Sequence, residues 1–256
     1  MLLAVDIGNT NISYGLFDKE KIVFRAKVAT EKKMTAEQHA VTLSAVAQMK
    51  KILLSDVDGA IISSVVPELT SPVKEAILIL TGVNAIVLGP GVKSGLSIRI
   101  DNPAQLGADL VAGAVGALEK FHPPCLIIDL GTATKISVID SGGVYKGCTI
   151  SAGVGISLSA LSGSAALLPD INIELEKCTA FGTNTVSSMQ TGIVLGTAAM
   201  LDGMCDRIEE SLGVNIKSVV ATGGYASDII KYCKRKINYE PDLIFYGLKA
   251  IFEKNA

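Results

Sequence analysis

The stretch LLAVDIGNTNI, residues 2–12, decides the fold, because a similar stretch, CLIIDLGTATKI, occupies residues 125–136. In each copy an apolar run ends in an aspartate, Asp6 or Asp129, and a short turn containing glycine leads into a second apolar run. Such a pattern is typical of two strands joined by a tight turn. The second copy begins near the middle of the 256-residue chain. The repeat therefore predicts two duplicated halves.

The two turns have the composition of phosphate-binding loops. Gly8 and Gly131 allow backbone N–H groups to approach a ligand closely, and Asn9, Thr10 and Thr132 add side-chain donors. If the turns faced one another, they would hold the phosphate chain of a nucleotide. The other reading of the first turn is an ordinary hairpin, for which Gly-Asn is also a good signal.

Each half also shows the same order of predicted elements: three strands, a helix, a strand and a helix. In the first half we expect strands at 2–5, 12–17, 21–28, 60–67 and 85–88, with helices at 35–51 and 71–80. In the second half we expect strands at 125–130, 135–139, 143–149 and 218–221, with helices at 191–212 and 226–233. Alternation of this kind indicates an α/β protein with helices on the faces of mixed sheets.

Composition excludes several classes of partner. Lys and Arg number 23 and Asp and Glu 25, giving a net charge of −2, so no positive field attracts nucleic acid or an acidic membrane. The N-terminus lacks the pattern of a signal peptide. The most apolar long window, residues 76–88, is shorter than the roughly 20 residues that span a bilayer. We expect a soluble, cytoplasmic protein with no nucleic-acid or membrane partner.

Cysteine and histidine offer little material for metal or nucleophilic sites. The five cysteines are scattered singly, which favours buried, reduced thiols. His39 and His122 are the only histidines, and we expect His39 on the surface of a helix.

Further segments narrow the assignment. In chain order they are residues 6–12 (DIGNTNI), 63–67 (SSVVP), 102–103 (NP) leading to 107–109 (GAD), 129–134 (DLGTAT), 182–185 (GTNT) and 222–224 (TGG). Together they resemble the type III pantothenate kinases, a family of the actin, hexokinase and Hsp70 superfamily. The resemblance runs from residue 1 to residues 247–248.

The resemblance implies two duplicated ribonuclease-H-like, actin-like ATPase domains that face a central cleft. The first, residues 1–118, would carry the phosphate-binding turn, and the second, residues 119–256, the cation, adenosine and dimer contacts. The implied activity is ATP-dependent phosphorylation of pantothenate to 4′-phosphopantothenate, the first step of coenzyme A biosynthesis. It further implies ATP, magnesium and a monovalent cation (potassium or ammonium) as cofactors, and a homodimer.

In the first half, the resemblance makes Asp109 the proton acceptor for the pantothenate hydroxyl, and the alternative reading from the residues alone is a helix N-cap. Asp6 is either a ligand on the magnesium side or a structural cap on the turn. The expected ATP and phosphate contacts here are Asp6, Ile7, Gly8, Asn9, Thr10, Asn11, Ile12 and Ser13. The expected pantothenate contacts are Gly107, Ala108, Asp109 and Leu110.

In the second half, the resemblance assigns the monovalent cation to Asp129 and an ATP phosphate contact to Thr132. Thr185 would contact pantothenate, or else cap the helix that follows it. Gly223 and Gly224 would flank the adenosine, or else form only a tight strand-to-helix turn.

The chain departs from the family at four places. Leu110 replaces a usual arginine, Ile100 a common tyrosine, Ser151-Ala152-Gly153 the usual Ala-Pro-Gly, and Lys135 a typical threonine. The first three changes affect the acceptor side more than the phosphate side. Two alternatives therefore stay open: a non-catalytic regulatory or binding relative of the same fold, and a kinase for another small hydroxylated acid.

Overall fold

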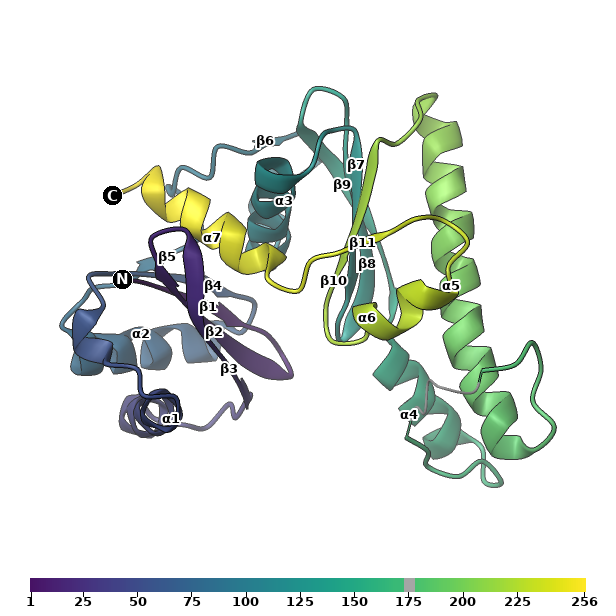
Figure 1. The fold of residues 1–256 in the computed structure, drawn as a ribbon, viewed down its shortest axis with the longest axis horizontal. Helices are drawn as coiled ribbons and strands as arrows, with labels where there is room; N and C mark the ends of the chain where they lie inside the picture. The colour runs from purple at the N-terminus through teal and green to yellow at the C-terminus, as the bar shows by residue number, and fades with distance from the viewer. Residues whose placement is uncertain (173–177) are drawn as a thin grey trace. The chain divides into compact units, whose positions relative to one another are not determined.

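The computed structural model describes residues 1–172 and 178–256, which form two compact units (Figure 1). Unit 1 comprises residues 1–96, 101–120 and 243–256, and unit 2 comprises residues 97–100 and 121–242. The expected division at residue 118 differs from these units in three places. Residues 97–100 lie with unit 2, and both residues 119–120 and the C-terminal residues 243–256 lie with unit 1.

Unit 1 is built on a five-stranded mixed sheet in the order β3-β2-β1-β4-β5. The chain runs antiparallel through the first three strands, and β4 and β5 then add parallel to β1. The strands are β1 (Leu2–Ile7), β2 (Asn11–Asp18), β3 (Lys21–Ala29), β4 (Gly59–Ser64) and β5 (Ile86–Val87). The helices are α1 (Ala36–Met49), α2 (Pro67–Thr81), α3 (Ala108–Lys120) and α7 (Leu243–Glu253), with 3-10 turns at Leu54–Asp56 and Pro103–Gln105.

Unit 2 repeats the arrangement in the order β11-β10-β7-β8-β9-β6. Here β7, β8 and β9 are antiparallel neighbours, and β10 and β11 add parallel to β7. The strands are β6 (Ser97–Ile98), β7 (Cys125–Leu130), β8 (Ala133–Ile139), β9 (Val144–Ala152), β10 (Ser218–Thr222) and β11 (Asn238–Tyr239). The helices are α4 (Val154–Ser164), α5 (Thr185–Leu212) and α6 (Ala226–Ile229), with a 3-10 turn at Ile230–Tyr232. Apart from the added edge strand β6, the two sheets share one topology, which confirms the predicted duplication.

Local signals explain where α1 and α2 begin. Thr35 caps α1 through the predicted capping box, in which its side chain accepts from the N–H of Gln38 and the Gln38 side chain accepts from the N–H of Thr35. Helix α2 begins at Pro67, four residues before the predicted start at Ser71, because proline suits the first helical position as well as it ends a strand. No helix within the described residues is long and apolar enough to cross a bilayer.

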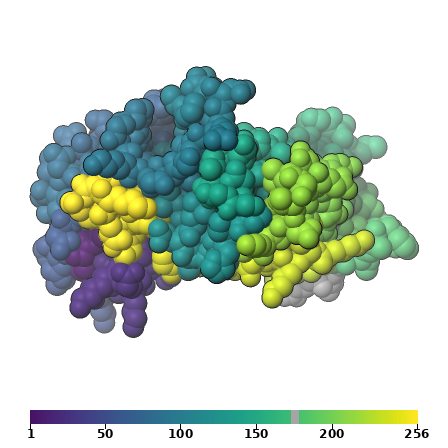
Figure 2. All heavy atoms as spheres, turned by 90° about the horizontal axis from the view of Figure 1, so that it is seen from above, coloured from purple at the N-terminus to yellow at the C-terminus, as the bar shows by residue number. Residues whose placement is uncertain are grey.

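Helix α7 belongs to unit 1 because it crosses α3 at unusually close range. A Cβ on Gly116 would lie 2.1 Å from the carbonyl oxygen of Leu243, and one on Gly247 would lie 1.8 Å from that of Ala112. Only glycines allow this contact between the two helix backbones. In Figure 2 the yellow C-terminal atoms on the left accordingly lie against the purple and blue atoms of unit 1.

Two predictions about single residues are wrong. His39 is 2% exposed, and its burial lowers the pKa of the imidazole from 6.5. Cys148 is exposed, whereas Cys125 and Cys205 are buried as expected. Burial raises the pKa of both of these thiols to about 11, so they are protonated at neutral pH.

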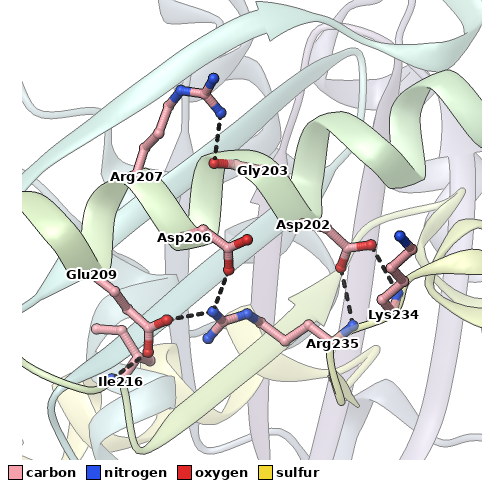
Figure 3. A network of polar contacts seen from close by, with 8 residues as sticks. All are labelled: Asp202, Gly203, Asp206, Arg207, Glu209, Ile216, Lys234 and Arg235. Carbon is pink, nitrogen blue, oxygen red and sulfur yellow. Dashed lines mark hydrogen bonds and ion pairs between the residues drawn. The ribbon is translucent and has the colours of Figure 1, made fainter.

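An ionic network in unit 2 joins α5 to the segment before β11 (Figure 3). The Arg235 guanidinium bonds the carboxylates of Asp206, at 2.7 Å, and Glu209. The backbone N–H groups of Lys234 and Arg235 donate to Asp202 at 2.8 and 3.1 Å. Glu209 also accepts from the N–H of Ile216 at 2.7 Å. The network fixes the chain on either side of β10 to one helix.

We predict that Arg235→Met lowers the free energy of unfolding by about 1–2 kcal/mol at pH 7, because Glu209 is 21% exposed and would lose its charged partner. The Arg235 hydrogen bond, with smaller help from Ile216, lowers the pKa of Glu209 from 4.5. Its stabilisation is therefore complete above pH 4.5 and is lost as the pH falls through the lowered value. Urea unfolding at pH 7 and at pH 3 measures both effects.

Arg207→Met is the matched control, since Arg207 lies on the same helix as Asp206 and Glu209 and its guanidinium donates to the carbonyl oxygen of Gly203 in that helix (Figure 3). We expect a change within about 0.5 kcal/mol for this variant. Equal stability losses in the two variants would contradict the role given to Arg235.

Candidate active site

Asp6 is the second-last residue of β1, and the strand on each side of it carries a serine at the paired position. In the register of the sheet, Asp6 lies opposite Ser13 of β2 and opposite Ser63 of β4. Ser63 is fully buried, and its hydroxyl makes no hydrogen bond to any group in residues 1–172 or 178–256. A buried hydroxyl that its own protein leaves unbonded is suited to a polar ligand. The carboxylate and hydroxyl oxygens therefore provide hard ligands at this end of the sheet.

The turn after Asp6 is a hairpin with an exposed tip. The N–H of Gly8 donates to the carbonyl oxygen of Asn11 at 2.9 Å, and the Thr30 hydroxyl donates to the carbonyl oxygen of Gly8 at 2.7 Å. Asn9 and Thr10 are exposed. The hairpin reading of this turn is thus correct as a description of the backbone, and the tip of the hairpin is exposed.

The ends of β1 and β4 and the segment that leads into α3 lie next to one another in unit 1. The N–H of Val65, just after β4, donates to the carbonyl oxygen of Ile7 at 3.0 Å. A Cβ on Gly107 would lie 3.7 Å from the Val65 side chain and 2.6 Å from a carboxylate oxygen of Asp109. Glycine at 107 therefore makes the space in which the Asp109 carboxylate lies.

Asp109 is the second residue of α3, and its carboxylate accepts from the N–H of Leu110 at 2.8 Å. The positive end of the helix favours a negative charge there. The structure thus brings two of the predicted groups together in unit 1, residues 6–13 and residues 107–110. It places the other predicted residues, Asp129, Thr132, Thr185, Gly223 and Gly224, in unit 2.

In unit 2 the turn after Asp129 is enclosed by two glycines. A Cβ on Gly153 would lie 2.2 Å from the carbonyl oxygen of Thr132, and one on Gly223 would lie 2.6 Å from backbone atoms of Leu130. Gly223 also has φ = +99°, which favours glycine. The N–H of Tyr225 donates to the carbonyl oxygen of Leu130 at 3.2 Å. The strand-to-helix turn after β10 is therefore as tight as its sequence suggests.

Asp129 has a charged neighbour on the next strand. It lies opposite Lys135 of β8, whose ammonium nitrogen is 3.0 Å from a carboxylate oxygen of Asp129. The two side chains are only 21% and 18% exposed. On the other side, Asp129 lies opposite Thr222 of β10, which is 5% exposed.

Thr185 does not cap α5. The cap is Asn184, whose side chain accepts from the N–H of Ser187 at 2.9 Å, while Thr185 is the first helical residue and is exposed. The N-cap reading of Thr185 is therefore wrong, because the capping box is formed one residue earlier. The exposed hydroxyl is available for a ligand contact.

Ser63 and Gly153 were not predicted as site residues from the sequence. Ser63 appeared only within a motif, and its position beside Asp6 depends on the parallel pairing of β1 with β4. Gly153 follows β9, which in sequence looks like an ordinary strand end. Its contact with the Thr132 carbonyl could have been suspected only from the pairing of β8 with β9.

Comparison with known proteins agrees with the fold and the motifs. The profile of the family described as type III pantothenate kinase matches residues 2–207. A type III pantothenate kinase of Shouchella clausii is 37% identical over 257 residues, with both chains covered completely. The corresponding protein of Exiguobacterium sibiricum is 36% identical over 255 residues, again with 100% of each chain covered.

Solved structures with lower identity share the fold. A Baf family protein of Campylobacter jejuni, described as a putative transcriptional activator, has a TM-score of 0.60 at 20% identity, covering 99% of this chain and 98% of that one. The activator of 2-hydroxyisocaproyl-CoA dehydratase from Clostridium difficile, with bound ADPNP, has a TM-score of 0.59 at 13% identity, covering 99% and 94%. A ROK hexokinase of Thermus thermophilus has a TM-score of 0.52 at 12% identity, covering 99% and 98%. The full-length matches at over 35% identity and the family profile show that this chain belongs to the type III pantothenate kinase family.

Proposed function

We propose that this chain transfers the γ-phosphoryl group of ATP to the hydroxyl of pantothenate, giving 4′-phosphopantothenate and ADP, the first step of coenzyme A biosynthesis. The proposal is supported chiefly by three segments that lie next to one another in unit 1. They are the end of β1 with Asp6, the end of β4 with Ser63, and the start of α3 with Asp109. The family's relatives are named for this activity.

The residues around Asp6 fit magnesium and a phosphate chain. Asp6 and Ser13 offer oxygen atoms, and the buried Ser63 hydroxyl has no hydrogen-bond partner within the described residues. Magnesium bound there would neutralise charge on the triphosphate. Asn9, Thr10 and the backbone of the turn up to Ser13 would donate hydrogen bonds to the phosphate oxygens.

Asp109 would act on the acceptor. As the pantothenate hydroxyl oxygen forms its bond to the γ-phosphorus and the bond to ADP breaks, the hydroxyl proton passes to the Asp109 carboxylate. The N–H of Leu110 fixes one oxygen of this carboxylate at 2.8 Å, which holds the group in one orientation. Gly107, Ala108 and Leu110 would line the acceptor position.

Unit 2 would supply the remaining contacts. We assign an ATP phosphate contact to Thr132, adenosine contacts to Gly223 and Gly224, and a pantothenate contact to the exposed Thr185. The monovalent cation expected at Asp129 does not fit this chain, because the Lys135 ammonium already lies 3.0 Å from that carboxylate.

Asp109→Asn should reduce the turnover number with pantothenate by about 10²–10⁴-fold, since an amide cannot accept the proton. The thermal midpoint should change little, because the amide oxygen can still accept from the N–H of Leu110. ADP release in the presence of Mg-ATP and pantothenate measures the rate.

Asp18→Asn is the matched control: it removes an exposed carboxylate from the end of β2 in the same unit and should retain full activity. Wild-type protein that releases no ADP with any acceptor would support the non-catalytic alternative. ADP release with a different hydroxylated acid, and not with pantothenate, would support the alternative of a kinase for another small acid. Unchanged turnover in Asp109→Asn would refute the role of Asp109.

Gly153→Ala should raise the KM for ATP severalfold and lower stability by about 1–3 kcal/mol, because its methyl group would displace the Thr132 carbonyl from the proposed phosphate turn. Gly163→Ala in α4 is the control, since a Cβ there meets no atom within 4 Å. Steady-state kinetics with varied ATP checks the pair. A normal KM in Gly153→Ala would argue against a phosphate role for this turn.

We further propose that the chain acts in the cytoplasm as a homodimer. Exposed apolar side chains of unit 2, including Ile150 at 68%, Leu167 at 92% and Phe181 at 74%, are available for a subunit contact. Sedimentation equilibrium should therefore give twice the 26.7 kDa mass of the chain. A single species of 26.7 kDa at micromolar concentration would exclude the dimer.

A further inference from the structure

We propose that the ammonium group of Lys135 takes the place of the monovalent cation at Asp129, so that this chain works without potassium or ammonium ions. The proposal rests on the proposed kinase activity for its catalytic consequence. Its structural part, that a positive charge of the chain itself occupies the carboxylate, can be tested separately.

The geometry of the pair is set by the sheet. Asp129 and Lys135 are direct cross-strand neighbours in the antiparallel pairing of β7 with β8, on either side of the turn at residues 131–132. Directly opposed side chains on neighbouring strands contact one another without distorting the backbone. The Nζ to Oδ2 distance of 3.0 Å is that of a charge-assisted hydrogen bond. The ammonium group is therefore fixed beside the turn that carries Thr132.

Charge and solvent exposure make a second cation unfavourable there. A potassium ion at the Asp129 carboxylate would lie close to the Lys135 ammonium, and the two positive charges would repel each other. Because the side chains are only 21% and 18% exposed, water screens this repulsion weakly. A lysine ammonium carries the same charge as either ion and is held by its chain, so it is present at any salt concentration.

The equivalent position in unit 1 provides an internal comparison. Asp6 lies opposite Ser13, an uncharged residue with an oxygen atom, in the same cross-strand relation. In the register of the two sheets, the aspartate of β1 therefore pairs with two serines, and the aspartate of β7 pairs with a lysine on one side. The duplicated scaffold thus places an ammonium group directly opposite the aspartate of unit 2.

The test compares wild type with Lys135→Thr and Lys135→Arg in potassium, ammonium and choline buffers of equal ionic strength. We expect the rate of ADP release by wild type with pantothenate to agree within about twofold in the three buffers, because the Lys135 ammonium group is part of the chain. Lys135→Thr should lose about tenfold or more of its rate in choline and regain it with potassium. Lys135→Arg retains the positive charge and should remain independent of potassium.

Thermal unfolding gives a readout that needs no substrate and so separates this proposal from the proposed function. Potassium in place of choline should raise the midpoint of Lys135→Thr by about 2–4 °C and leave wild type unchanged. Lys217→Thr removes an exposed lysine of the same unit and should behave as wild type in both assays. Activation or stabilisation of wild type by potassium would overturn the proposal, as would a Lys135→Thr variant that does not respond to potassium in either assay.

Discussion

The structure depends on the placement of an aspartate near the carboxyl end of β1 in one sheet and of β7 in the other, between one antiparallel and one parallel neighbour. Asp6 lies between Ser13 and Ser63, and Asp129 between Lys135 and Thr222. Parallel pairing of β1 with β4, and of β7 with β10, brings the ends of both strands to one edge of each sheet. The tight turns that follow β1 and β7 lie at this edge, and they provide backbone and side-chain hydrogen-bond donors there.

Glycines then determine how closely other segments approach these aspartates. Gly107 leaves room for the Asp109 carboxylate at the start of α3, and Gly153 and Gly223 enclose the turn after Asp129. Gly116 and Gly247 play a different part, since they let α7 return to unit 1 and pack on α3. These contacts explain why a chain with 25 glycines uses some of them at positions where even a methyl group would not fit.

Much of this organisation could be predicted from the sequence because the duplication repeats a strong local pattern. The strands around Asp6 and Asp129 and the capping box at Thr35 follow from residue types at short spacing. The return of α7 to unit 1 could not be predicted, because it depends on a contact between helices far apart in the chain. The same limit applies to Ser63, whose position beside Asp6 is a property of strand pairing, and to His39, whose burial depends on what packs over α1.

In the proposed function the two equivalent aspartates differ in role, and Asp6 is the one proposed to hold magnesium. Calorimetric titration of ATP into wild type and Asp6→Asn, with magnesium or with EDTA, tests this most directly. The account predicts that magnesium strengthens ATP binding to wild type and does not strengthen binding to Asp6→Asn. An equal gain from magnesium in both proteins would contradict it.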